Sequence, residues 1–96
     1  MTKVECEVEC TVRNAAGEAF VRVRQLYAES WYFGEGASLD GCPLVPVTPW
    51  KENASPLTRT FGMFVYDFHL SRPDDIGRFS PGMKVIFRPG IPRFGR

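Results

Sequence analysis

The chain has 96 residues, 44% of them hydrophobic and 14% aromatic, which is enough for one small domain with an apolar core. Its formal net charge of +1 is far from the strongly basic balance typical of nucleic-acid-binding domains. The sequence contains neither an apolar run long enough to cross a bilayer nor a signal-peptide pattern, and its first strand pattern begins almost at once. These features predict a cytoplasmic protein without membrane contact.

Residues 3–13 alternate small apolar and polar side chains without a break, and only a β-strand places such a pattern on two opposite faces. The predicted core face consists of Val4, Cys6, Val8, Cys10 and Val12. The next residues, Asn14-Ala15-Ala16-Gly17, suit a tight reversal, so a second strand should pair with the first.

The register of this hairpin follows from matching apolar to apolar and acidic to basic residues. A four-residue loop places Arg13 opposite Glu18. The pairs that follow are Cys10 with Val21, Val8 with Val23, Glu9 with Arg22, and Glu7 with Arg24. The charged face is then expected to be a solvated sheet surface.

The cysteines favour a reduced protein. Cys6 and Cys10 share a strand face but lie about 13 Å apart, which is too far for a disulfide. Cys42 lies in a proline-rich stretch. Three thiols and one histidine without a C-x-x-C spacing make a poor zinc site, and no cofactor is predicted.

The middle of the chain is less regular. The aromatic-rich residues 26–33 favour a continuation of the second strand. Residues 37–57 contain four prolines, which exclude a long helix and any central strand, although residues 44–47 suit a sheet edge. A loop of this length in so small a domain is more often functional or mobile than idle.

Regular structure returns at residues 60–70, which are apolar on both faces, a pattern typical of a central strand or of one covered by a loop. Turns are predicted at 71–75 and 80–82, with a short strand or one helical turn between them, and a last strand at 83–88. We therefore predict an all-β protein, a small antiparallel barrel or sandwich of about five strands. Residues 1–88 form the single domain, and residues 89–96 form an extended C-terminal tail.

Catalysis has little support in this sequence. The only histidine, His69, would share a strand face with Asp67, and an acid–base couple of these two beside Cys42 or Ser71 is the sole catalytic hypothesis. A polar strand end that reaches water or one hydrogen bond explains His69 more simply. We predict that the protein is not an enzyme.

Two binding functions remain. A single-strand nucleic-acid binder would use Trp31 and Tyr32 for stacking and Arg22 and Arg24 for phosphates, but acidic residues flank all of these positions. Residues 1–76 carry a net charge of −4 and residues 77–96 a net charge of +5. This asymmetry fits bases that balance the acidic sheet face within one molecule, and it also fits an end that meets nucleic acid, an acidic partner or the acidic surface of another copy.

The leading prediction is a non-catalytic protein-interaction module, with nucleic-acid binding as the alternative. Its partner is a protein, either a second copy or a foreign chain. Sheet edges invite pairing, and rigid aromatic side chains anchor interfaces. The predicted partner-binding residues are Trp50, Arg88, Ile91, Arg93 and Phe94.

Overall fold

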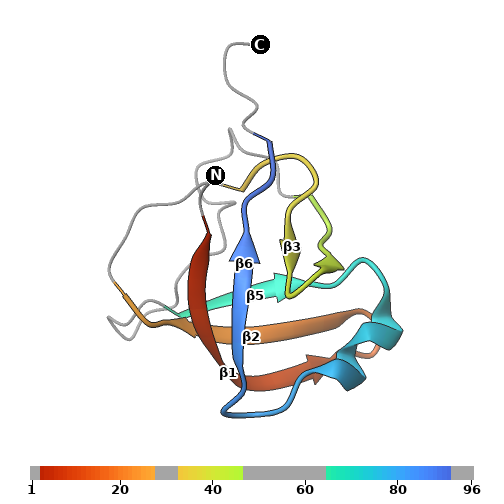
Figure 1. Ribbon diagram of the computed structural model, residues 1–96. Helices are drawn as coiled ribbons and strands as arrows, with labels where there is room; N and C mark the ends of the chain where they lie inside the picture. The colour runs from red at the N-terminus through yellow and green to blue at the C-terminus, as the bar shows by residue number, and fades with distance from the viewer. Residues whose placement is uncertain (1–2, 28–32, 47–64, 92–96) are drawn as a thin grey trace.

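The computed structural model describes residues 3–27, 33–46 and 65–91. They form one antiparallel six-stranded sheet in the order β4-β3-β6-β1-β2-β5, which curls into a half-barrel (Figure 1). The elements are β1 (Val4–Arg13), β2 (Ala19–Gln25), β3 (Ser38–Leu39), β4 (Cys42–Pro43), β5 (Val65–His69), the 3-10 helix η1 (Pro73–Arg78) and β6 (Lys84–Arg88). The predicted all-β, barrel-like fold class is confirmed.

The β1–β2 hairpin follows the predicted register only at its end far from the turn. Glu7 pairs with Arg24 and Val8 with Val23, as expected, but Arg13 pairs with Ala19. The turn causes this difference. The Asn14 side-chain oxygen accepts hydrogen bonds from the amides of Ala16 and Glu18 at 3.0 and 2.9 Å, and Gly17 has a φ of 86°. Five residues, Asn14 to Glu18, therefore separate the two strands, one more than predicted.

A β-bulge between Val8 and Cys10 absorbs the one-residue difference. It also reverses the faces of the rest of β1, because side chains alternate with a period of two. Cys10 therefore lies opposite Arg22 rather than Val21, and Val12 is 44% exposed. The predictions that Cys10 and Val12 belong to the core face, and that Glu9 pairs with Arg22, are wrong.

The chain leaves the sheet after Gln25. Leu26, Tyr27 and Phe33 lie outside any strand, so the predicted continuation of the second strand is wrong at these positions; residues 28–32 lie outside the described residues. The buried Gln25 side chain donates to the Tyr27 carbonyl at 2.6 Å and accepts from the Tyr66 hydroxyl at 3.1 Å. These bonds satisfy the buried side-chain amide of Gln25 at the point where the chain leaves the sheet.

Residues 38–43 form a small hairpin where an irregular loop was predicted. Asp40 and Gly41 connect β3 to β4 with φ values of 52° and 85°, the signature of a tight hairpin turn. β3 also pairs with β6, so it lies inside the sheet and the exclusion of an interior strand here is wrong. Leu44 continues from β4 and forms an antiparallel bridge with Leu70, which joins the two margins of the sheet at one end.

The second half of the chain follows its predictions more closely. The strand predicted at 60–70 is present as β5 from Val65 to His69, while residues 60–64 lie outside the described residues. β5 lies at the end of the strand order rather than in its middle. The Pro-Gly turn before β6 is confirmed, since the Met83 amide donates to the Ser80 carbonyl at 3.0 Å and Gly82 has a φ of 88°. Of the two alternatives before this turn, the helical one is correct, because η1 occupies it.

The core lies inside the curl of the half-barrel. The rings of Phe68 on β5 and Phe87 on β6 stack across it with centroids 4.7 Å apart, and Phe33 packs at 5.8 Å from Phe87. The buried hydrophobic residues are Val4, Cys6, Val8, Ala19, Val21, Val23, Ala37, Leu39, Cys42, Leu44, Phe68, Leu70, Phe79, Val85 and Phe87. These contacts fix the position of the C-terminal end of β6, where the predicted partner-binding residues begin.

Candidate interaction surface

The chain directly after β6 is attached to the body of the protein. The Gly34 amide donates to the Pro89 carbonyl at 2.7 Å, and Glu35 and Ile91 exchange two backbone hydrogen bonds of 2.9 Å each. Gly34 and Gly90 make this approach possible, because a Cβ on either would collide with the opposite backbone. Residues 89–91 therefore form a fixed base from which the remaining C-terminal residues start.

Exposed side chains surround this base. Ile91 is 67% exposed, the highest value among the large hydrophobic residues that the structure describes as exposed. Arg88 is exposed at the end of β6, and exposed Lys3 directly precedes Val4, which pairs with Phe87. No carboxylate within the described ranges forms an ion pair with either cation. Trp50, Arg93 and Phe94 lie outside the described residues.

The arginines of the nucleic-acid hypothesis are engaged by carboxylates. Arg22 holds Asp67 with two bonds of 2.8 and 3.1 Å, and this carboxylate raises the pKa of the guanidinium. Arg24 lies 3.2 Å from both Glu7 and Glu9. The predicted Glu7–Arg24 pair is therefore present.

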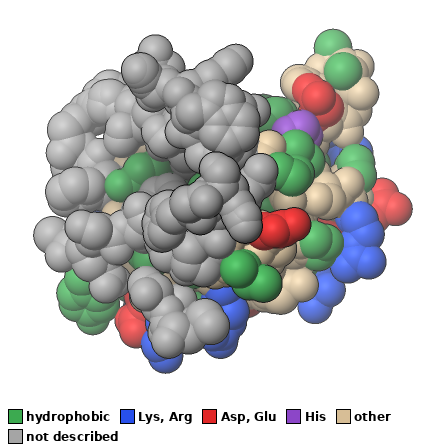
Figure 2. All heavy atoms as spheres, turned by 90° about the horizontal axis from the view of Figure 1, so that it is seen from above, with side chains coloured by type: hydrophobic (Ala, Val, Ile, Leu, Met, Phe, Trp, Pro, Cys, Tyr) green, Lys and Arg blue, Asp and Glu red, His purple; other side chains and the backbone are tan. Residues whose placement is uncertain are grey.

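The partner of Arg22 is Asp67 on β5 rather than Glu9, because of the bulge in β1. Among the described side chains on the face shown in Figure 2, acidic and basic groups are interspersed. Trp31 and Tyr32 lie outside the described residues. The charges of Arg22 and Arg24 are thus largely balanced before any ligand arrives.

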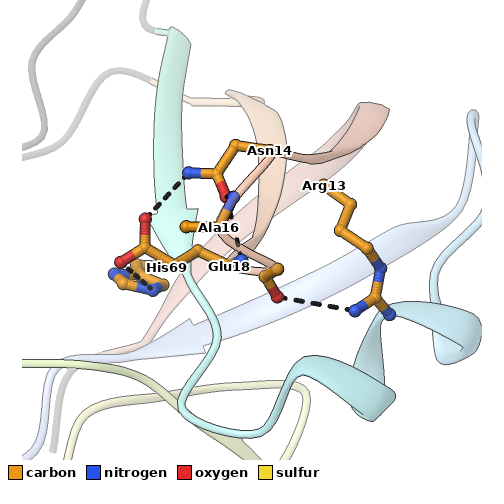
Figure 3. A network of polar contacts seen from close by, with 6 residues as sticks. Arg13, Asn14, Ala16, Glu18 and His69 are labelled. Carbon is orange, nitrogen blue, oxygen red and sulfur yellow. Dashed lines mark hydrogen bonds and ion pairs between the residues drawn. The ribbon is translucent and has the colours of Figure 1, made fainter.

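His69 belongs to a polar network at the hairpin turn (Figure 3). Its Nε2 lies 3.9 Å from a Glu18 carboxylate oxygen, and its ring stacks on Phe20 with centroids 4.5 Å apart. The other Glu18 oxygen accepts from the Asn14 amide at 2.8 Å. Because Asp67 is bound to Arg22, His69 interacts with Glu18 instead, an arrangement that braces the turn.

The cysteines are free thiols, and Cys6 and Cys42 are each 1% exposed. Burial raises the pKa of the Cys42 thiol, and the nearby Asp75 carboxylate adds to this effect. A protonated, buried thiol is a poor nucleophile. Within residues 3–27, 33–46 and 65–91, no group of three His, Cys, Asp or Glu side chains is placed to hold a metal ion.

No helix in the described part of the chain combines the length and apolar character needed to cross a membrane. Comparison with protein-family models, with curated proteins and with solved structures finds no match for this chain.

Sequence reasoning missed two features of this surface. Lys3 was not singled out, because its place at the same end of the sheet as Arg88 depends on the pairing of Val4 with Phe87. The contact between Gly34 and Gly90 joins residues far apart in the chain, and neither glycine carries a local signal for the other. Pairing of distant segments is visible only once the sheet is assembled.

Proposed function

We propose that this protein is a non-catalytic interaction module, either a subunit of an assembly or a small regulator of a larger protein. The observation that carries the proposal is the fixed base at residues 89–91, which presents exposed Ile91 close in sequence to Arg88. Arg88 and Lys3 are exposed cations that form no ion pair with a carboxylate of the described residues. An exposed apolar side chain on a rigid backbone loses little conformational entropy when a partner covers it.

The residues that follow extend the same surface in sequence. Arg93 and Phe94 add a cation and an aromatic ring, which are residue types enriched at interface hot spots. Trp50 is a further proposed contact. The three free thiols suit a reducing compartment, so we include a cytoplasmic location in the proposal.

The alternative, binding of single-stranded nucleic acid, has less support. Its two arginines already interact with Asp67, Glu7 and Glu9, so phosphates would have to compete with these carboxylates. We retain this alternative only as an outcome that the experiments below detect.

The test is a truncation after Ile91, which removes residues 92–96 but keeps the paired base. We expect the truncated chain to retain its β-sheet circular dichroism and its unfolding midpoint but to lose association with its partner. Arg88→Gln should weaken association. Arg78→Gln, which removes an exposed cation on η1, is the matched control and should have no effect. A truncated chain that associates as strongly as the full chain would overturn the proposal.

A further inference from the structure

The second half of β1 is attached to the sheet on one side. The ladder between β1 and β6 covers Val4 to Glu7, and Val8 adds hydrogen bonds of 2.9 and 2.8 Å with Met83 and Gly82. Beyond this point, the backbone of residues 10–13 pairs with β2 alone among the described strands. A change in the register of residues 10–13 therefore leaves the ladder between β1 and β6 intact.

The observed pairing of this segment, which we call the bulged register, turns polar side chains toward the core. Thr11 lies opposite Val21, and Arg13 lies opposite Ala19, although both partners on β2 are 0% exposed. Val12 points to the outer face and is 44% exposed. Because burial of the apolar set normally decides the register of a strand, another contact has to hold this segment in place.

That contact is the hairpin turn, whose side chains bind its backbone (Figure 3). The Asn14 side-chain oxygen accepts hydrogen bonds from the Ala16 and Glu18 amides, and the Asn14 side-chain amide donates to the Glu18 carboxylate at 2.8 Å. The Arg13 guanidinium donates to the Pro73 carbonyl at 3.3 Å, which ties the turn to η1. These bonds belong to the five-residue connection of the bulged register.

The same sequence also fits a second pairing, which we call the straight register. If β1 continues past Val8 without a bulge, Cys10 faces Val21 and Val12 faces Ala19, so that both apolar side chains enter the core. The alternating pattern of β1 thus satisfies the sheet in either register. The charged pairs that the straight register forms are Glu9 with Arg22 and Arg13 with Glu18.

We propose that β1 is a two-register strand and that the Asn14 turn is its switch. The turn contacts hold the bulged register, which exposes Val12, and their release moves residues 9–13 by one position and buries Val12. A partner that binds the turn or covers Val12 therefore stabilises the bulged register, because it contacts this state and not the other. The inference goes beyond the proposed function, since none of the C-terminal residues takes part in it.

The experiment measures the rate at which a thiol reagent labels Cys10 in an Asn14→Ala variant. Cys10 is half-buried in the bulged register and faces the core in the straight one. Loss of the two bonds to the Asn14 oxygen should slow the labelling of Cys10 by about tenfold. Buried Cys42 in the same molecule reports global opening. Cross-strand NMR contacts of Cys10 should move from Arg22 to Val21.

Val12→Lys is the matched variant that locks the bulged register. The lysine reaches solvent in that register, whereas the straight register would bury its charge against Ala19. Val12→Lys alone should leave Cys10 labelling unchanged, and Val12→Lys added to Asn14→Ala should restore the rate of the parent chain.

If Asn14→Ala does not fold, Asn14→Ser replaces it. Its hydroxyl oxygen still accepts from the Ala16 amide, so the decrease in Cys10 labelling should be smaller but in the same direction. The proposal is overturned if the folded variant labels Cys10 as fast as the parent chain or faster. It is equally overturned if Val12→Lys fails to restore the rate.

Discussion

Replacing glycines at the base of the C-terminal segment tests how that base is built. Gly90 has a φ of 84°, and a Cβ there would collide with the Glu35 carbonyl oxygen and lie 2.9 Å from the Ala37 amide nitrogen. Gly34 has an ordinary φ but meets the Ile91 and Pro89 carbonyls. Gly82 has a φ of 88° with no atom within 4 Å of a Cβ, so it is the control for φ alone.

The expected losses follow from these three environments. Gly82→Ala should reduce the free energy of unfolding by about 1–2 kcal/mol, the cost of a left-handed backbone for alanine. Gly34→Ala should detach residues 89–91, which loses three backbone hydrogen bonds at about 1 kcal/mol each, or about 3 kcal/mol in total. Gly90→Ala should cost a similar amount, because detachment relieves both its collision and its φ strain.

The double variant distinguishes one shared loss of stability from two independent losses. Once either substitution has detached residues 89–91, the second has little left to disrupt, so Gly34→Ala with Gly90→Ala should cost about as much as either alone. Urea unfolding followed by circular dichroism gives all four values. The paired base would be refuted by a Gly34→Ala variant whose free energy of unfolding lies within about 0.5 kcal/mol of that of the parent chain, which is the range of ordinary surface changes.

Three other outcomes follow from burial. Val12→Ala on the outer face should cost less than about 0.5 kcal/mol, whereas Val21→Ala in the core should cost about 1.5–3 kcal/mol, and equal losses in urea unfolding would contradict the bulge. A thiol reagent followed by mass spectrometry should label half-buried Cys10 before buried Cys42, and the reverse order would contradict the packing. Burial and Asp75 raise the pKa of the Cys42 thiol in the folded state. The stabilising effect of the protonated thiol is therefore fully present below the unfolded-state pKa of about 9, and it is lost as pH rises through the folded-state pKa. Cys42→Ala should therefore flatten the alkaline decline in urea midpoint, and an unchanged slope would count against this environment.

The sequence predicted the fold class because alternation in β1, β2 and β6 is a local signal. It did not predict the bulge, because the alternating pattern of β1 continues through Cys10 and Val12. The register was decided by competition between two local preferences. The Asn14–Gly17 turn favours the register in which Arg13 pairs with Ala19, whereas the Val8–Val23 pair belongs to a register shifted by one residue. One extra residue in β1 allows both pairings.

The β3–β4 hairpin was predictable, since Asp40-Gly41 is a strong hairpin signal that the surrounding prolines concealed. The position of β5 at the end of the strand order was not decided by the sequence, because a residue pattern that is apolar on both faces fits either a central strand or a strand covered by a loop. The predicted partner-binding residues Arg88 and Ile91 lie together near the fixed base, but that base depends on Gly34, which is distant in sequence.

The most direct test of an interaction module that works through its C-terminal end is the native mass of residues 1–96 and 1–91, measured by size exclusion with light scattering. The ultraviolet absorbance ratio of the same peak reports any bound nucleic acid. We predict a full chain that elutes above its monomer mass of 10.9 kDa, free of nucleic acid, and a truncated chain that elutes as a monomer. Oligomers with the same number of subunits for the two chains, or a nucleic-acid signal that salt removes, would contradict the account.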